Sequence, residues 1–71
     1  MEWNYTTQLE GQDVIVFWWL EADEAGIYDS EVRMVLYKGI DVLPILSEET
    51  IYELDGRSMN EYEANLKEKW A

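Results

Sequence analysis

Residues 14–20 read Val14-Ile15-Val16-Phe17-Trp18-Trp19-Leu20, and this run of β-branched and aromatic residues decides the fold that we predict. Alternate side chains of a strand point to opposite faces of a sheet, and every position of the run is apolar. Such a strand needs protection on both faces, or it leaves an exposed apolar patch on one of them. We therefore predict that residues 14–20 form the middle strand of a sheet.

The segments before and after this run predict its neighbours in the sheet. Residues 2–9 alternate between polar and mostly apolar side chains, which is typical of a half-buried strand. A turn at residues 10–13, in which Gly11 can take a positive φ, joins this strand to the middle one as a hairpin. After a polar connection at residues 21–30, alternation at residues 31–37 predicts a third antiparallel strand. One face of that strand consists of Val32, Met34 and Leu36, and the other of Glu31, Arg33, Val35 and Tyr37.

The C-terminal third of the chain has the pattern of helices. Ser47 can cap a helix whose first turn holds Glu48 and Glu49, where carboxylates complement the positive end of the helix dipole. Asp55-Gly56 predicts the end of that helix, and Ser58-Met59-Asn60-Glu61 matches a capping box that starts a second one. The apolar stripe of the second helix consists of Met59, Tyr62, Leu66 and Trp70. Because that glycine is the only clear interruption, one broken helix is an alternative.

Length and pattern together fix the fold class. A chain of 71 residues is long enough for one hydrophobic core and too short for two. We therefore predict a single domain over residues 1–71. Its class is α+β, with a three-stranded antiparallel meander sheet followed by one or two C-terminal helices, in the order βββαα.

The residue types present limit the chemistry that the chain can perform. There are no Cys and no His residues, which removes thiolate nucleophiles, thiolate zinc sites and imidazole bases. The sequence contains no P-loop, nucleophile elbow or Gly-rich dinucleotide turn. Glycoside hydrolysis needs two carboxylates about 5 to 10 Å apart across a cleft, for which so small a domain has little room. We predict that the protein is not an enzyme and that it uses no cofactor, catalytic residue or metal site.

Charge is the strongest signal in the sequence. Sixteen Asp and Glu residues against 5 Lys and Arg residues give a net charge of -11. Phosphates and anionic lipids repel such a chain, so we expect no direct binding to nucleic acid and no membrane association. The longest apolar run is far shorter than the ~20 residues of a membrane span, and the N-terminus lacks the basic start of a secretory signal. Together with the absence of Cys, this predicts a cytoplasmic protein, in the host cytoplasm if the chain is viral.

The acidic residues are unevenly distributed along the chain. Residues 1–31 contain eight acids and no base. We predict that these eight make the main contacts with a basic partner: Glu2, Glu10, Asp13, Glu21, Asp23, Glu24, Asp29 and Glu31. A second group of predicted contacts consists of Asp41, Glu48 and Glu49.

The number of carboxylates is close to the charge of a short DNA duplex. Duplex DNA carries one phosphate charge per ~1.7 Å of axis, and a compact domain of this length is roughly 29 Å across, which corresponds to about 17 charges. The chain has 16 acidic residues. A rigid surface of this charge density would compete for a groove lined with Lys and Arg. Charge therefore predicts a basic nucleic-acid-binding protein as the partner.

A resemblance points in the same direction. A short, acidic, Trp-rich chain without Cys or His looks like the small phage-encoded inhibitors of host defence, the anti-CRISPR and anti-restriction DNA mimics. The segment Gly39-Ile40-Asp41-Val42, followed by Leu46-Ser47-Glu48-Glu49, is similar to a strand-to-helix stretch of short phage proteins. The resemblance implies a viral protein that evades host defence. Such a protein binds the DNA-binding subunit of a CRISPR surveillance complex, or a restriction enzyme, and blocks target DNA.

The aromatic residues leave a second hypothesis open. If helices cover only one face of the sheet, the other face would expose a patch consisting of Phe17, Trp19, Val35 and Tyr37. The protein would then be a small interaction or assembly module, and its acids would serve solubility. The same patch could make a homodimer, so we expect a monomer or a weak homodimer. Binding through carboxylates should weaken steeply with salt, whereas an aromatic interface should be nearly indifferent.

Overall fold

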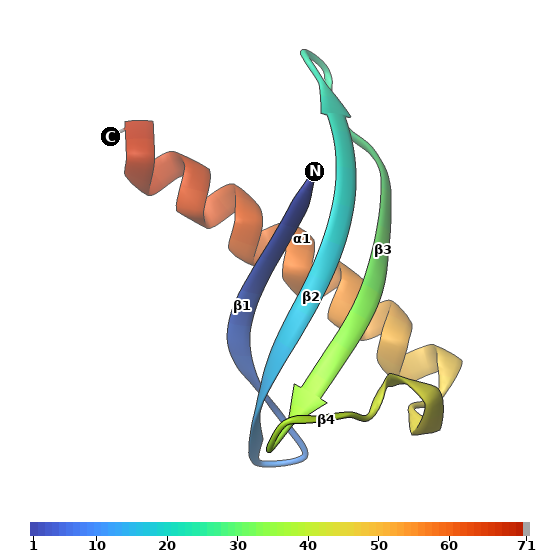
Figure 1. Ribbon diagram of the computed structural model, residues 1–71. Helices are drawn as coiled ribbons and strands as arrows, with labels where there is room; N and C mark the ends of the chain where they lie inside the picture. Colours follow the sequence, from blue (N-terminus) through green and yellow to red (C-terminus); the bar gives the residue numbers. More distant parts are fainter. Residues whose placement is uncertain (71) are drawn as a thin grey trace.

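The structure, a computed structural model, describes the backbone of residues 1–70 and the side chains of residues 1–67. Three long strands come first, and a short strand, one 3-10 turn and a long helix follow. Their bounds are β1 (Glu2–Leu9), β2 (Gln12–Asp23), β3 (Gly26–Tyr37), β4 (Ile40–Asp41), η1 (Leu43–Ile45) and α1 (Glu48–Trp70). Figure 1 shows α1 lying diagonally across one face of the twisted sheet. The α+β class is as predicted.

The strands form one antiparallel sheet in the order β1-β2-β3-β4. β2 lies between β1 and β3, which confirms the central position predicted from its apolar character on both faces. The prediction of three strands is wrong by one. β4 is only two residues long and pairs with the last two residues of β3, so it has no alternation that a sequence pattern could display.

The first two hairpin turns of the sheet differ in how well the sequence predicts them. Between β1 and β2, Glu10 and Gly11 both have positive φ, at 51° and 75°, which suits the twist of a two-residue hairpin. Between β2 and β3, only Glu24 and Ala25 lie outside the strands, because Asp23 already pairs with Gly26. The segment predicted as a connection at residues 21–30 is therefore mostly strand. Most of its side chains are exposed, so it lacks the alternation of polar and apolar residues that predicts a half-buried strand.

A β-bulge in β3 decides which residues face the helix. Phe17 pairs with Met34, but its neighbour Trp18 pairs with Val32, so Arg33 is an extra residue in the ladder. The extra residue shifts the alternation that follows it by one position. The prediction that Val35 and Tyr37 share an exposed patch with Phe17 and Trp19 is consequently wrong: Val35 is 0% exposed and Tyr37 packs against the core. Met34 and Leu36 occupy the other face instead.

The face that α1 covers holds the hydrophobic core. Its buried residues are Val14, Val16, Trp18, Leu20, Val32, Val35 and Leu54, of which the last comes from α1. Four aromatic rings pack together on this face. The ring centroid of Trp3 lies 5.0 Å from that of Tyr5, 5.6 Å from that of Tyr62 and 6.4 Å from that of Trp18. The centroids of Trp18 and Tyr62 are 5.9 Å apart. Burial stabilises each large apolar side chain by about 1.5–3 kcal/mol relative to exposure, so this layer is the main source of stability.

The C-terminal segment is one continuous helix. Ser47 caps it as predicted, since its Oγ accepts a hydrogen bond from the Thr50 amide at 3.2 Å. The predicted break at Asp55-Gly56 is wrong, and Ser58 is a buried residue inside the helix rather than a cap. Packing of Leu54 against the sheet outweighs the cost of about 1 kcal/mol for a glycine in a helix. Met59 and Tyr62 of the predicted stripe pack on the core, whereas the Trp70 side chain lies outside the described residues.

Candidate functional site

The face of the sheet opposite α1, here called the open face, is the candidate functional surface. It is formed by β1, β2 and β3, and Figure 1 shows no element in front of them. The strand register orders its side chains in rows that run across the sheet. From the β1–β2 turn toward the β2–β3 turn, the rows are Thr6, Ile15 and Leu36; Asn4, Phe17 and Met34; then Glu2, Trp19 and Glu31.

Apolar side chains occupy the middle of the open face. This apolar band consists of Ile15, Phe17, Trp19, Met34 and Leu36. Ile15 is 40% exposed and the other four are half-buried by one another, without a helix above them. The band exists because β2 is apolar at every position from 14 to 20 and only one of its faces is needed for the core. A contiguous apolar patch of this kind is typical of an interaction surface.

Carboxylates gather at one end of the same face, near the β2–β3 turn. This acidic end consists of Glu2, Glu21, Asp23, Glu24, Asp29 and Glu31, all exposed. Glu21 lies directly opposite Asp29 in the ladder, and Glu2 and Glu31 lie on either side of Trp19. Like charges opposite each other in a sheet are destabilising. Their placement therefore works against folding.

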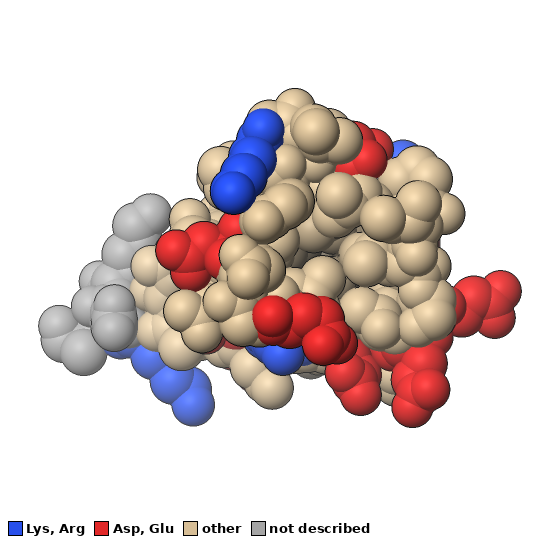
Figure 2. Space-filling view, turned by 90° about the horizontal axis from the view of Figure 1, so that it is seen from below, with Lys and Arg blue, Asp and Glu red and all other residues tan. Residues whose placement is uncertain are grey.

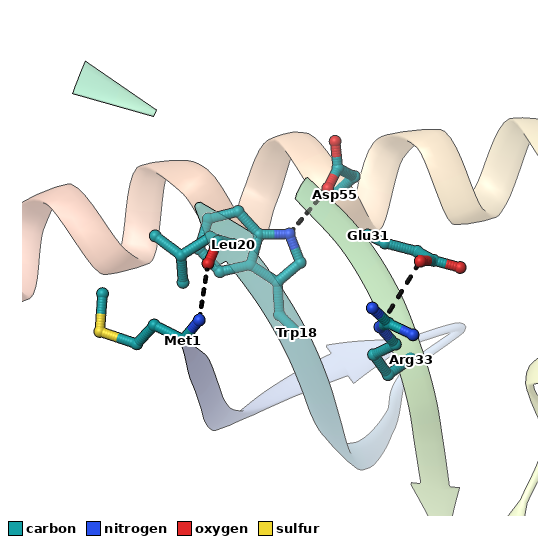
Figure 3. A network of polar contacts seen from close by, with 6 residues as sticks. All are labelled: Met1, Trp18, Leu20, Glu31, Arg33 and Asp55. Atoms are coloured by element: carbon teal, nitrogen blue, oxygen red, sulfur yellow. Dashed lines mark hydrogen bonds and ion pairs between the residues drawn. The ribbon is translucent and has the colours of Figure 1, made fainter. Parts of the chain in front are cut away.

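One base, Arg33, lies beside the acidic end. Its Nε is 3.5 Å from a carboxylate oxygen of Glu31, and its guanidinium carbon is 5.0 Å from the ring centroid of Trp19. Figure 3 shows the side chains of Arg33 and Glu31 turned toward each other. This is the one ion pair among the side chains of residues 1–67. The remaining carboxylates of the acidic end form no ion pair within that part of the chain.

The other five predicted contact residues lie elsewhere. Glu10 is in the β1–β2 turn, and Asp13 is on the open face next to that turn, at the end opposite the acidic end. Glu48 and Glu49 are in the first turn of α1. Asp41 has a structural role, because its Oδ1 accepts hydrogen bonds from the amides of Leu43 at 3.0 Å and Val35 at 3.3 Å. Figure 2 looks at the end with the β1–β2 turn and shows carboxylates in separate groups with uncharged surface between them. The predicted acids therefore do not form one continuous surface.

A hollow of about 550 Å³ lies between the apolar band and the acidic end. Its lining residues are Glu2, Trp3, Asn4, Phe17, Trp18, Arg33 and Met34. The β-bulge creates it, since the extra residue places Arg33 and Met34 on the same face of β3. The site thus combines an apolar floor with a carboxylate, an amide and a guanidinium at its rim.

Polar contacts tie α1 and the N-terminus to the strands of the sheet. Asp55 of α1 accepts hydrogen bonds from Trp18 Nε1 at 2.7 Å and from Ser30 Oγ at 3.2 Å, so one carboxylate ties α1 to β2 and β3. The N-terminal amine of Met1 donates to the Leu20 carbonyl at 2.9 Å. Figure 3 shows the contact between Trp18 and Asp55 and the contact between Met1 and Leu20. The sequence did not predict this role of Asp55, because Asp55-Gly56 matches the pattern of a helix end.

Tyr5 links β1 to α1 in a similar way. Its hydroxyl lies 2.8 Å from Ser58 Oγ, which in turn donates to the Leu54 carbonyl at 2.7 Å. Burial raises the pKa of the Tyr5 phenol above its ordinary value of 10.0, and the hydrogen bond with Ser58 lowers it in part. The phenol therefore stays protonated and serves as a hydrogen-bond donor at neutral pH.

Two further observations concern the described part of the chain. Among the side chains of residues 1–67, no group of three or more carboxylates is arranged to hold a metal ion. None of the helices described has an apolar stretch long enough to cross a membrane.

The comparisons with known proteins identify no relative of this chain. No protein-family model matches the sequence, and neither a curated protein nor a solved structure matches it.

Proposed function

We propose that this protein is a phage-type inhibitor that binds a DNA-binding host-defence protein and blocks its target DNA. In this proposal the acidic end of the open face occupies a basic surface on a CRISPR surveillance complex or a restriction enzyme. The observation that supports it most is the convergence of six exposed carboxylates at this end, with Arg33 the one base beside them in residues 1–67. The protein acts by binding alone.

The size of the acidic end indicates how much DNA it could replace. Residues 19–23 of β2 span about 14 Å at the rise of an antiparallel strand. A duplex of that length carries about 8 phosphate charges, of which a bound protein faces only a part. The six carboxylates of the acidic end are similar in number to the phosphates that a bound protein would face. The proposal is therefore restricted to a local contact, and the remaining acids contribute long-range attraction.

The first experiment is capture of a partner from a bacterial lysate, followed by competition with duplex DNA for whatever is captured. We expect the partner to be a nucleic-acid-binding protein that duplex DNA displaces from the inhibitor, because the two anions share one surface. A partner that binds DNA and the inhibitor at the same time would contradict the proposal.

A charge-reversal variant then tests the acidic end itself. In Glu21→Lys, Glu24→Lys, Asp29→Lys, three exposed carboxylates become cations, and we expect binding and inhibition to be lost. Asp23 is left in place because its Oδ1 accepts a hydrogen bond from the Ala25 amide at 2.8 Å and so holds the turn. The matched control reverses Glu53, Glu61 and Glu63, which are exposed on α1, and should retain inhibition. Equal loss in both variants would show that net charge alone matters.

The apolar band favours a second candidate function, an interaction or assembly module. In this alternative the uncovered side chains of β2 and β3 make the contact, and the acids maintain solubility. Both candidate functions use the same face of the sheet, so the location of the binding site does not distinguish them. The dependence of the affinity on salt concentration does. An interface made by the apolar band should bind nearly as well at high ionic strength as at low. Sedimentation of the protein alone would show whether the band makes a homodimer.

A further inference from the structure

The hollow on the open face brings aromatic, apolar and polar side chains together. Phe17 and Met34, which are neighbours in one row of the sheet, both line it. Glu2 and Asn4 from the edge strand β1 lie on one side of it, and Arg33 lies on the other. Within the described side chains, neither the Glu2 carboxylate nor the Asn4 amide has an ion pair or a hydrogen bond.

The next row of the sheet already contains a comparable arrangement in complete form. There, Arg33 lies over the ring of Trp19 at 5.0 Å and pairs with Glu31 at 3.5 Å. An aromatic ring, a carboxylate and a guanidinium thus form a unit on this face. In the hollow, Phe17 supplies a ring and Glu2 a carboxylate, whereas the Arg33 guanidinium at its rim is already engaged by Trp19 and Glu31.

We propose that the hollow binds an arginine side chain of the basic partner protein. The guanidinium lies over the ring of Phe17, pairs with the Glu2 carboxylate and donates to the Asn4 side-chain oxygen, while the aliphatic stem packs on Met34. Arginine fits better than lysine because its planar group stacks on rings and pairs with a carboxylate through two hydrogen bonds. This inference rests on the proposed function, since it names the residue through which the partner is anchored.

A second copy of this chain is a poor source of that arginine. Its two arginines are Arg33, which pairs with Glu31, and Arg57, whose Nη1 donates to the Gln8 carbonyl at 2.7 Å and to Thr7 Oγ1 at 3.3 Å. Using either one would break contacts within its own molecule. Two copies would also bring together molecules that each carry a net charge of -11.

The test uses two capped hexapeptides as probes, one with three Arg-Gly repeats and one with three Lys-Gly repeats. Binding to the whole protein is followed by NMR, through the amide signals of Glu2, Asn4, Phe17 and Met34. We expect the arginine peptide to bind about threefold to fivefold more tightly than the lysine peptide, with the largest shifts at these four residues. Equal affinities, or shifts centred elsewhere, would overturn the arginine site.

Variants separate this inference from the general acidic surface. Phe17→Leu keeps an apolar floor and removes the ring, so it should abolish the preference for arginine without loss of the fold. Glu2→Gln should reduce the affinity for the arginine peptide more than for the lysine peptide. The matched control Glu24→Gln removes the same charge at the turn, outside the hollow, and should weaken both peptides equally.

The outcomes are distinguishable for the two proposals. If both peptides bind the acidic end equally and in a salt-dependent manner, the acidic surface stands and the arginine site is wrong. If neither peptide shifts any signal of the open face, both proposals are wrong. A preference for arginine that survives Phe17→Leu would also overturn the stacking geometry.

Discussion

The two faces of the sheet use the same strand for opposite purposes. On the covered face, β2 contributes Val14, Val16, Trp18 and Leu20, which are at most 3% exposed beneath α1. On the open face, the same strand contributes side chains that remain partly accessible, with Ile15 40% exposed. Apolar character at consecutive positions therefore does not mean that both faces belong to a core. One face stabilises the fold, and the other is available for contact.

The polar groups on the two faces also differ in whether they are paired with other groups of the protein. Among the described side chains, every buried nitrogen and oxygen atom has a hydrogen-bond partner, as in the contacts of Asp55 and Tyr5. On the open face, Glu21 lies opposite Asp29, and neither carboxylate forms an ion pair with the described residues. Satisfied polar groups stabilise the fold, whereas like charges that face each other in a sheet destabilise it. Stability and binding should therefore respond differently to substitutions on the two faces.

The largest effect is expected from Leu54→Ala on the covered face. Leu54 is 1% exposed and is the fully buried apolar residue that α1 supplies to the core. Its truncation should lower the free energy of unfolding by about 3 kcal/mol, measured by urea denaturation. Leu66→Ala, at a position 38% exposed on the same helix, serves as the control and should cost less than about 1 kcal/mol. Similar losses in the two variants would mean that α1 is not seated as described.

A smaller loss of stability is expected from Asp55→Ala. This variant leaves the indole N–H of Trp18 and the hydroxyl of Ser30 without their acceptor. The expected loss is about 2 kcal/mol, and Asp55→Asn should restore part of it because an amide oxygen can still accept. The neighbouring exposed residue gives the control Glu53→Ala, with an effect within about 0.5 kcal/mol. No difference between the two alanine variants would contradict the role of Asp55 as the tie between helix and sheet.

Neutralising one acid of the open face should raise the free energy of unfolding, whereas the two substitutions above lower it. Glu21→Gln removes the repulsion between Glu21 and Asp29, so the protein should become more stable by about 0.2–1 kcal/mol at low salt. The gain should shrink as salt screens the charges. Binding to the captured partner should weaken in the same variant. A variant that loses both stability and binding would show that Glu21 has a structural role.

The pH dependence of stability should show the smallest effect. Because burial raises the pKa of the Tyr5 phenol above 10.0, the unfolded chain loses this proton before the folded protein does. The contribution of Tyr5 is thus complete below about pH 10 and is lost as the pH rises through the folded-state pKa. We expect Tyr5→Phe to show a shallower loss of stability above pH 10 than wild type, in denaturation experiments at stepped pH.

A matched variant controls for the other tyrosines. Tyr52 is 80% exposed on α1, so Tyr52→Phe should follow the wild-type pH profile. If Tyr5→Phe also follows that profile, the phenol is not buried in solution as it is here.

The sequence predicts those parts of the fold in which one face is polar and the other apolar. β1 coincides with the predicted strand at residues 2–9, and the turn after it needs the positive φ that Gly11 supplies. The central position of β2 follows from its composition. The outer parts of β2 and β3 lie outside the predicted strands because, of residues 21–30, only Ile27 packs against the core, and a ladder without a buried face has no periodic signal.

The bulge at Arg33 limits how far the candidate site could be predicted. Strand alternation placed Val35 and Tyr37 on the open face, and a single extra residue in the ladder moved them to the core. A bulge depends on pairing with the neighbouring strand, so β3 alone carries no sign of it. The acids of the N-terminal half were chosen from charge alone. Spacing could not indicate that Glu2, Glu21 and Asp29 lie at one end, whereas Glu10 lies at the other.

The most direct test of the proposed function is the affinity for the captured partner as a function of salt, with and without duplex DNA. We predict that the dissociation constant rises by at least about tenfold between low and physiological salt, and that DNA competes with the protein. The triple variant Glu21→Lys, Glu24→Lys, Asp29→Lys should lose this salt-sensitive binding, whereas the α1 control retains it. An affinity that is indifferent to salt and to DNA would contradict the claim that carboxylates of the open face make the contact.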